Sequence, residues 1–375
     1  MLYEYMKSLG YTELEIDRVL NNYAFVRYTE DRLYKRIKTN HEFLLSLGYK
    51  KEKISSMLKI YPQIYDLDID NMKQKIEFLI TLGYSRNTSL RILGQAPMVY
   101  GYTIDNINKK LNDLTTLGYS YEEAIRMFKK FPSLFSLTID TIKHKIEDMV
   151  DLGYKNASLI KMTKVFPQLY GYSIQNIKKK FDDMCSLGYN FNQLIKMTES
   201  LPTLLGYSYD YLKRRIDDME AIGYKRQDII KMTKTTPAIF SYSIVNIKKK
   251  INDLMDLGYE LSQVIEITKT LPTLFGYTIE NIREKKSFYD AVGLSDIFIV
   301  DPKQLMQSVE LSCARYMFYR DNGKVIDMDN YEILFMNQKS FIKKHGKSNK
   351  ELRDEYSYEE FKRGIINGNV VLSRN

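Results

Sequence analysis

The segment PSLFSLTIDTIKHKIEDMVDLGYKNASLIKMTKVF, residues 132–166, is followed at once by PQLYGYSIQNIKKKFDDMCSLGYNFNQLIKMTESL, residues 167–201. The two segments have equal length and share the positions of proline, a serine or threonine, and glycine. The glycines recur every 35 residues at Gly48, Gly83, Gly118, Gly153, Gly188, Gly223, Gly258 and Gly293. Seven of the eight prolines keep this period: Pro62, Pro97, Pro132, Pro167, Pro202, Pro237 and Pro272. A fixed period of this size predicts a helical repeat protein that grows along one direction.

Residues 104–136 show how one repeat is built. We expect a first helix from Ile104 to Leu117, a second from Ser120 to about Phe131, and a short turn that begins at Pro132. The periodic glycine ends the first helix, because glycine adopts the left-handed conformation at little cost. Side-chain oxygens that can cap the first helix precede it in seven repeats: Asp68, Thr103, Thr138, Ser173, Ser208, Ser243 and Thr278.

Apolar residues follow helical spacing in both helices, as in Ile142, Ile146 and Met149 of one first helix. One repeat is too small to bury such a stripe, so neighbouring repeats must stack and the ends must be atypical. The first repeat has Ala24 in place of proline, and the last has Leu294 in place of tyrosine. We therefore predict an all-α solenoid of about nine repeats over residues 1–293 and a mostly helical cap over residues 294–375.

Two tyrosine rows share the period. The first row follows the glycines, and we expect it to pack on the preceding helix: Tyr84, Tyr119, Tyr154, Tyr189, Tyr224 and Tyr259. The second row is open to two interpretations, stacking on nucleic-acid bases or filling the core, and its period favours the core: Tyr102, Tyr172, Tyr207, Tyr242 and Tyr277.

Composition bounds the possible functions. Lys and Arg outnumber Asp and Glu by 56 to 47, which favours anionic partners. Cys185 and Cys313 are too few for a disulfide framework, and we expect neither a metal site nor a cofactor. No nucleophile motif or phosphate-binding glycine loop is present, so we expect no enzymatic activity. No apolar run could cross a membrane and no signal or transit peptide is visible, so we expect a cytoplasmic monomer, or an organellar protein whose presequence has been removed.

The positive charge lies on both helices of the repeat. Lysines of the first helix, such as Lys143 and Lys145, are followed by acids three or four residues later, so we expect a solvated, locally balanced face. The second helix carries two rows without a regular acid row: Arg91, Arg126, Lys161, Lys196 and Lys231, then Lys129, Lys164, Lys234 and Lys269. Such a stripe is typical of phosphate binding, and a merely solubilising surface is the alternative.

The pattern of Pro132 with Phe135, Ile142 and Met149, followed by Leu-Gly-Tyr, resembles the mitochondrial transcription termination factor (mTERF) family or a bacterial relative of it. The resemblance implies a superhelix whose repeats have two α-helices and a 3₁₀ turn. It also implies a basic concave groove for duplex DNA, or for RNA in some members, and a role in transcription regulation or termination.

The same resemblance extends to a closing segment that contains Arg315, which we include among the candidate nucleic-acid contacts. Two other functions stay open at this stage. One is a protein-binding scaffold, because many solenoids bind peptides or domains, and the other is binding of structured RNA.

Overall fold

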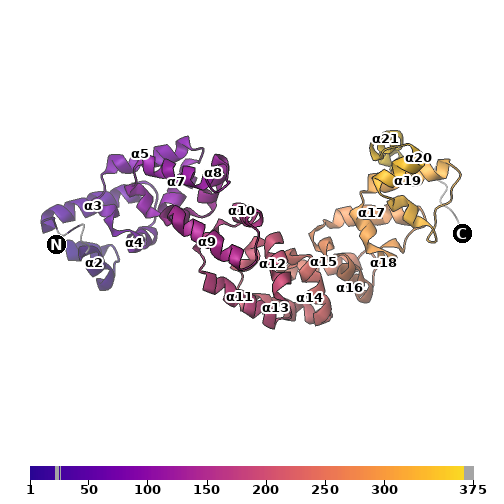
Figure 1. Cartoon of the computed structure of the whole chain (residues 1–375), viewed down its shortest axis with the longest axis horizontal. Coiled ribbons are helices and arrows are strands. Elements are labelled where there is room, and N and C mark those ends of the chain that lie inside the picture. Colours follow the sequence, from indigo (N-terminus) through magenta and orange to yellow (C-terminus); the bar gives the residue numbers. More distant parts are fainter. Residues whose placement is uncertain (22–24, 26, 367–375) are drawn as a thin grey trace. The chain divides into compact units, whose positions relative to one another are not determined.

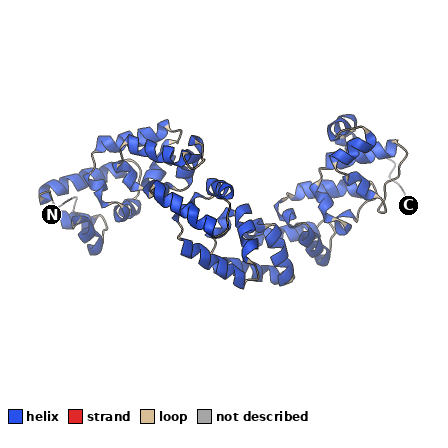
Figure 2. Ribbon diagram, viewed as in Figure 1, coloured by secondary structure: helices blue, strands red, loops and turns tan. Residues whose placement is uncertain are grey.

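The computed structural model describes residues 1–21, 25 and 27–366, and within these residues every regular element is a helix (Figure 2). The predicted all-α helical repeat fold is therefore confirmed. Ala24 lies outside the described residues.

A repeat consists of two α-helices followed by a 3₁₀ helix. Figure 1 labels α-helices of successive repeats along the chain. The first helices are α3 Glu30–Ser46, α5 Ile69–Thr81, α7 Ile104–Thr115, α9 Ile139–Asp151, α11 Ile174–Ser186, α13 Tyr209–Glu220, α15 Ile244–Met255 and α17 Ile279–Ala291. The second helices are α4 Lys51–Ile60, α6 Arg86–Gln95, α8 Tyr121–Lys130, α10 Asn156–Val165, α12 Phe191–Ser200, α14 Arg226–Thr235, α16 Leu261–Thr270 and α18 Ile297–Val300. The 3₁₀ helices are η1 Pro62–Asp66, η2 Pro97–Gly101, η3 Pro132–Ser136, η4 Pro167–Gly171, η5 Pro202–Gly206, η6 Pro237–Ser241, η7 Pro272–Gly276 and η8 Pro302–Met306.

The remaining helices form the two ends of the chain. The N-terminal pair is α1 Leu2–Ser8 and α2 Glu13–Leu20. The C-terminal elements are α19 Val309–Asp321, η9 Tyr331–Phe335, α20 Gln338–His345, α21 Asn349–Glu355 and α22 Tyr358–Ile366.

The helix ends have the predicted chemistry. The Thr138 hydroxyl accepts from the amide of Thr141 at 3.1 Å, and all seven predicted caps accept in the same way. Gly153 has a φ of 111°, and the amide of Tyr154 donates to the Met149 carbonyl at 3.2 Å, as in a Schellman motif. The first helix of the sample repeat ends at Thr115, two residues before the predicted Leu117, because the amides of Leu117 and Gly118 donate only three residues back, to the carbonyls of Leu114 and Thr115.

The row of tyrosines after the glycines joins successive repeats. Each ring is buried, and in four central repeats its hydroxyl bonds a threonine 44 residues later, as in Tyr224 to Thr268 at 2.6 Å. Thr268 donates its own proton to the Val264 carbonyl at 2.7 Å, so the tyrosine is the donor. This places the row in the structure between repeats, as the period predicts.

Lysines of the first helices correct one prediction. We expected a solvated face, but Lys110 is half-buried and donates to the Leu137 carbonyl, 27 residues later, at 2.9 Å. Lys250 and Lys285 make the corresponding bonds to the carbonyls of Tyr277 and Leu305. Burial lowers the pKa of all three. These lysines hold the 3₁₀ helix that closes their own repeat, because the carbonyls at its end have no partner within the helix.

The contacts divide the chain into two compact units. The first contains residues 1–183 and 198–206, and the second contains residues 184–197 and 207–375. In the second unit, the order of helix, 3₁₀ helix and helix continues through α18, η8 and α19, although α18 has only four residues. The division at residues 293 and 294 stays a prediction.

Candidate nucleic-acid interface

The first predicted row lies on the second helices of the repeats. Arg91, Arg126, Lys161, Lys196 and Lys231 are all exposed. Arg91 differs from the others, because its guanidinium donates to the Lys129 carbonyl at 2.6 Å and to Gln95 Oε1 at 3.2 Å. The carbonyls at a helix C-terminus carry partial negative charge. Arg91 therefore interacts with the C-terminal end of the second helix in the next repeat.

The second predicted row has two kinds of member. Lys129 and Lys234 are exposed, and neither takes part in an ion pair among the described residues. Lys164 Nζ lies 2.9 Å from Glu123 Oε1, and Lys269 Nζ lies 3.2 Å from Asp228 Oδ2 and 2.9 Å from Glu266 Oε1. Two of the four lysines in this row are therefore paired with individual acids, although no regular acid row accompanies them.

A common geometry explains both pairs. The lysine near the end of one second helix reaches the third residue of the preceding second helix, 41 residues earlier: Glu123 for Lys164, and Asp228 for Lys269. The residue in that position is Thr88 for Lys129 and Gln193 for Lys234, and neither carries a charge. The hydrogen bond from Lys164 is the first cause that lowers the pKa of Glu123, and the bond to Glu266 is the first cause that raises the pKa of Lys269.

Arg315 does not belong on this surface. Its side chain is 1% exposed, and its guanidinium donates to the carbonyls of Leu334 at 2.8 Å and Met336 at 2.6 Å and to Asn349 Oδ1 at 2.9 Å. Because all of these bonds are internal, we withdraw Arg315 from the predicted contacts. It is the C-terminal counterpart of Lys285, thirty residues earlier, and holds η9 as Lys285 holds η8.

Lys130 has a role that the sequence did not suggest. Its Nζ donates to the carbonyls of Lys164 at 3.0 Å and Val165 at 3.2 Å, at the end of the next second helix. A cation at a helix C-terminus is favoured by the helix dipole. The signal available in the sequence was its position 35 residues before the last residues of α10.

Of the two predicted rows, six exposed cations remain once Arg91 and the ion-paired lysines are set aside. The first compact unit carries Arg126, Lys129 and Lys161, which we call the first cluster. The second compact unit carries Lys196, Lys231 and Lys234, which we call the second cluster. Each cluster presents one pair of cations three residues apart on a single helix, so both members of that pair face the same side.

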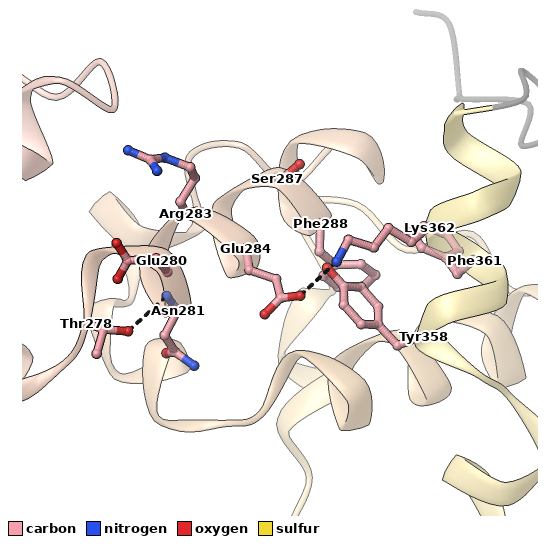
Figure 3. Close-up of a pocket in the computed structure, with 10 residues that line it drawn as sticks. All are labelled: Thr278, Glu280, Asn281, Arg283, Glu284, Ser287, Phe288, Tyr358, Phe361 and Lys362. Atoms are coloured by element: carbon pink, nitrogen blue, oxygen red, sulfur yellow. Dashed lines mark hydrogen bonds and ion pairs between the residues drawn. The ribbon is translucent and has the colours of Figure 1, made fainter.

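A cavity of about 730 Å³ lies between α17 and α22 in the second compact unit (Figure 3). At its floor Phe288, 1% exposed, meets Tyr358 and Phe361 with ring centroids 6.3 and 5.4 Å away. Glu284 and Lys362 form an ion pair of 3.1 Å at its side. The four preceding repeats have Asp148, Asp183, Asp218 and Asp253 in the position of Phe288. The change from an acid to Phe288 supplies the ring on α17 that Tyr358 and Phe361 of α22 contact.

The described residues lack two features that would point to other functions. No helix among them is long and apolar enough to cross a membrane. They also contain no group of three or more His, Cys, Asp or Glu residues placed to hold a metal ion.

The comparisons with known proteins agree with the repeat architecture. A comparison with curated proteins finds no match to the sequence. The sequence profile of the mTERF family matches residues 2–186 and 183–310, which is more than half of the chain. Members of this family generally bind nucleic acid in transcription termination. The chain therefore belongs to the mTERF family.

Proposed function

We propose that this protein is a non-enzymatic nucleic-acid-binding protein that holds duplex DNA and acts in transcription regulation or termination. The observation that carries the proposal is the set of exposed cations at equivalent positions of α8, α10, α12 and α14. The concave groove expected from the resemblance is part of the proposal, as are binding as a monomer and the absence of a cofactor.

Phosphate is the group that such a row suits best. Lysine and arginine side chains release condensed counterions when they bind the phosphate backbone, which gives strong and salt-dependent affinity. Contacts of this kind fix position along the nucleic acid and carry no sequence information by themselves. The row thus supports backbone binding, and base recognition is left to other side chains.

The test is a binding titration with fluorescently labelled duplexes of DNA and of RNA, measured by anisotropy between 50 and 200 mM salt. We expect binding whose logarithm falls linearly with the logarithm of salt concentration. Reversal of Arg126, Lys161, Lys196 and Lys231 to Glu should abolish it. Tighter binding of the RNA duplex would move the partner from DNA to structured RNA. If neither duplex binds at 50 mM salt, the protein-binding scaffold replaces the proposal.

The compartment belongs to the proposal as well. Both cysteines are free thiols, Cys313 buried and Cys185 exposed, which suits a reducing environment such as the cytoplasm or an organelle interior. Family membership favours a mitochondrion or plastid. Fluorescence microscopy of the tagged full-length protein with organelle markers tests the assignment.

A further inference from the structure

The cations of the second helices are not equally available to bind phosphate. Helix α8 carries Arg126 and Lys129, and α14 carries Lys231 and Lys234; none of the four is in an ion pair among the described residues. The helices that follow them differ. On α10 the lysine nearest the C-terminus is ion-paired, and so is the corresponding lysine on α16.

The carboxylate of Glu123 is ordered by the helix cap independently of its ion pair with Lys164. Its Oε2 accepts from the amide of Ser120 at 2.8 Å as part of a capping box, and its Oε1 lies 2.9 Å from Lys164 Nζ. The two side chains are 23% and 32% exposed. Because the helix cap already orders the carboxylate, the ion pair costs little further side-chain entropy. Lys164 is therefore neutralised by a fixed partner rather than by a mobile surface acid.

Lys269 is neutralised twice. Asp228 lies 3.2 Å away on the preceding second helix, and Glu266 lies 2.9 Å away on the same helix. Lys269 and Asp228 are each 25% exposed. Glu266 also occupies the position that Arg126 or Lys161 holds in other repeats, so α16 presents no open cation in either predicted row.

The two acids occupy equivalent positions, the third residue of α8 and of α14. These are the two helices that carry both open cations. Each thus combines an open pair near its C-terminal end with an acid near its N-terminal end that neutralises the lysine of the next second helix.

We propose that Glu123 and Asp228 are built-in counter-ions that withdraw Lys164 and Lys269 from nucleic acid. Glu123 thereby keeps Lys164 from adding a fourth open cation to the first cluster, and Asp228 keeps Lys269 from extending the second cluster to α16. This inference rests on the proposed function. Each cluster offers three open cations to phosphate, and the acids limit that number by pairing with Lys164 and Lys269.

The first test is Glu123→Gln in the full-length chain, with binding to a labelled DNA duplex measured at several salt concentrations. Glutamine keeps the capping oxygen and removes the charge. We expect the salt dependence to steepen by about 0.9, so that the affinity ratio of variant to parent grows roughly 3.5-fold between 200 and 50 mM salt. Lys164→Gln alone should change little, and in combination it should cancel the effect of Glu123→Gln.

Glu147→Gln is the matched control, because Glu147 is exposed on the first helix α9 and forms no ion pair among the described residues. Circular dichroism and the melting temperature of each variant check folding. In the second unit, Asp228→Asn with Glu266→Gln should free Lys269, and Glu147→Gln with Asp151→Asn is the control of equal charge.

The outcomes separate the two proposals. If the parent binds and the fourfold charge reversal abolishes binding, but Glu123→Gln behaves as Glu147→Gln does, the counter-ion role is wrong and the proposed function stands. If the parent binds no duplex, the proposed function fails and the inference fails with it. A steeper salt dependence that disappears in the Lys164→Gln background supports the inference.

Discussion

The tyrosine that follows the periodic glycine has different hydrogen-bond partners in the central repeats and at the two ends of the chain. In the centre, the hydroxyl after the glycine bonds a threonine of the next repeat, as Tyr189 bonds Thr233 at 2.6 Å. At the N-terminus, Tyr11 meets Tyr65 at 3.1 Å, and Tyr65 in turn meets His41 Nδ1 at 2.7 Å. At the C-terminus, the buried hydroxyl of Tyr259 has no hydrogen-bond partner among the described residues.

The difference shows that stacking supplies the hydrogen-bond partner of this tyrosine only where the neighbouring repeat is regular. In the four central repeats a regular neighbour offers the same partner, so one tyrosine and one threonine suffice. At the ends the neighbour changes, and α18 has only four residues, so the partner has to be replaced or is lost. The C-terminus compensates with other anchors, chiefly the aromatic contact of α22 and the buried Arg315.

The largest expected effect comes from removing the aromatic anchor. Phe288→Ala should destabilise the second compact unit by roughly 3–5 kcal/mol, because it empties a buried site between α17 and α22. Urea denaturation followed by circular dichroism measures this. Phe288→Leu is the milder control, and equal stability of parent and alanine variant would show that α22 is not anchored there.

Arg315→Ala should have the next largest effect, roughly 3 kcal/mol. It leaves the carbonyls of Leu334 and Met336 without the charged donor that now satisfies them. Limited proteolysis should show cleavage after Arg320 or Lys324 before the repeats are cut. Arg315→Lys should recover part of the stability, and unchanged denaturation of the alanine variant would contradict the anchoring role.

The tyrosine comparison predicts that the same substitution, Tyr→Phe, changes the free energy of unfolding differently at two positions. Tyr224→Phe removes a buried hydrogen bond to Thr268 and should cost about 1 kcal/mol. Tyr259→Phe removes a buried hydroxyl without a partner and should be neutral or stabilising by up to about 1 kcal/mol. Thermal and urea unfolding of the two variants side by side give the sign, and destabilisation of similar size in both would break the comparison.

The smallest effect concerns pH at the N-terminal end. His41 is 1% exposed, and burial lowers its pKa below the ordinary 6.5, with Lys51 adding to the effect and Glu42 opposing it. The unfolded chain then binds more protons, so the stability due to neutral His41 is present above pH 6.5 and decreases as the pH falls below it. His41→Asn should flatten the dependence of the urea midpoint between pH 5 and 8, and an unchanged slope would contradict this account.

Much of the fold could be predicted because local chemistry repeats. Glycine in the left-handed conformation, proline at the first position of a 3₁₀ helix and a capping oxygen act within a few residues of themselves, so their spacing reports helix ends directly. The helix boundaries and the seven caps followed from this. The exposed members of the second-helix row, such as Arg126 and Lys231, were also found by helical spacing.

The roles of individual cations were harder to predict. Lys110, Lys129, Lys164 and Arg315 are alike in charge and in their place on a helix, yet one holds a carbonyl, one is open, one is ion-paired and one is buried. The partner that decides each case lies 19 to 41 residues away. Spacing within one helix carries no information about such a partner until the stacking of repeats is known.

The sequence by itself thus determined the period, the helix ends and which rows carry charge, because these depend on contacts within one repeat. Only the tertiary structure decided which charges stay open, which lysines Glu123 and Asp228 pair with, and how α22 packs at the C-terminal end. The physical reason is that the groups around a charged side chain decide whether it is open, paired or buried. For a helical repeat, those surroundings belong to the next repeat along the chain.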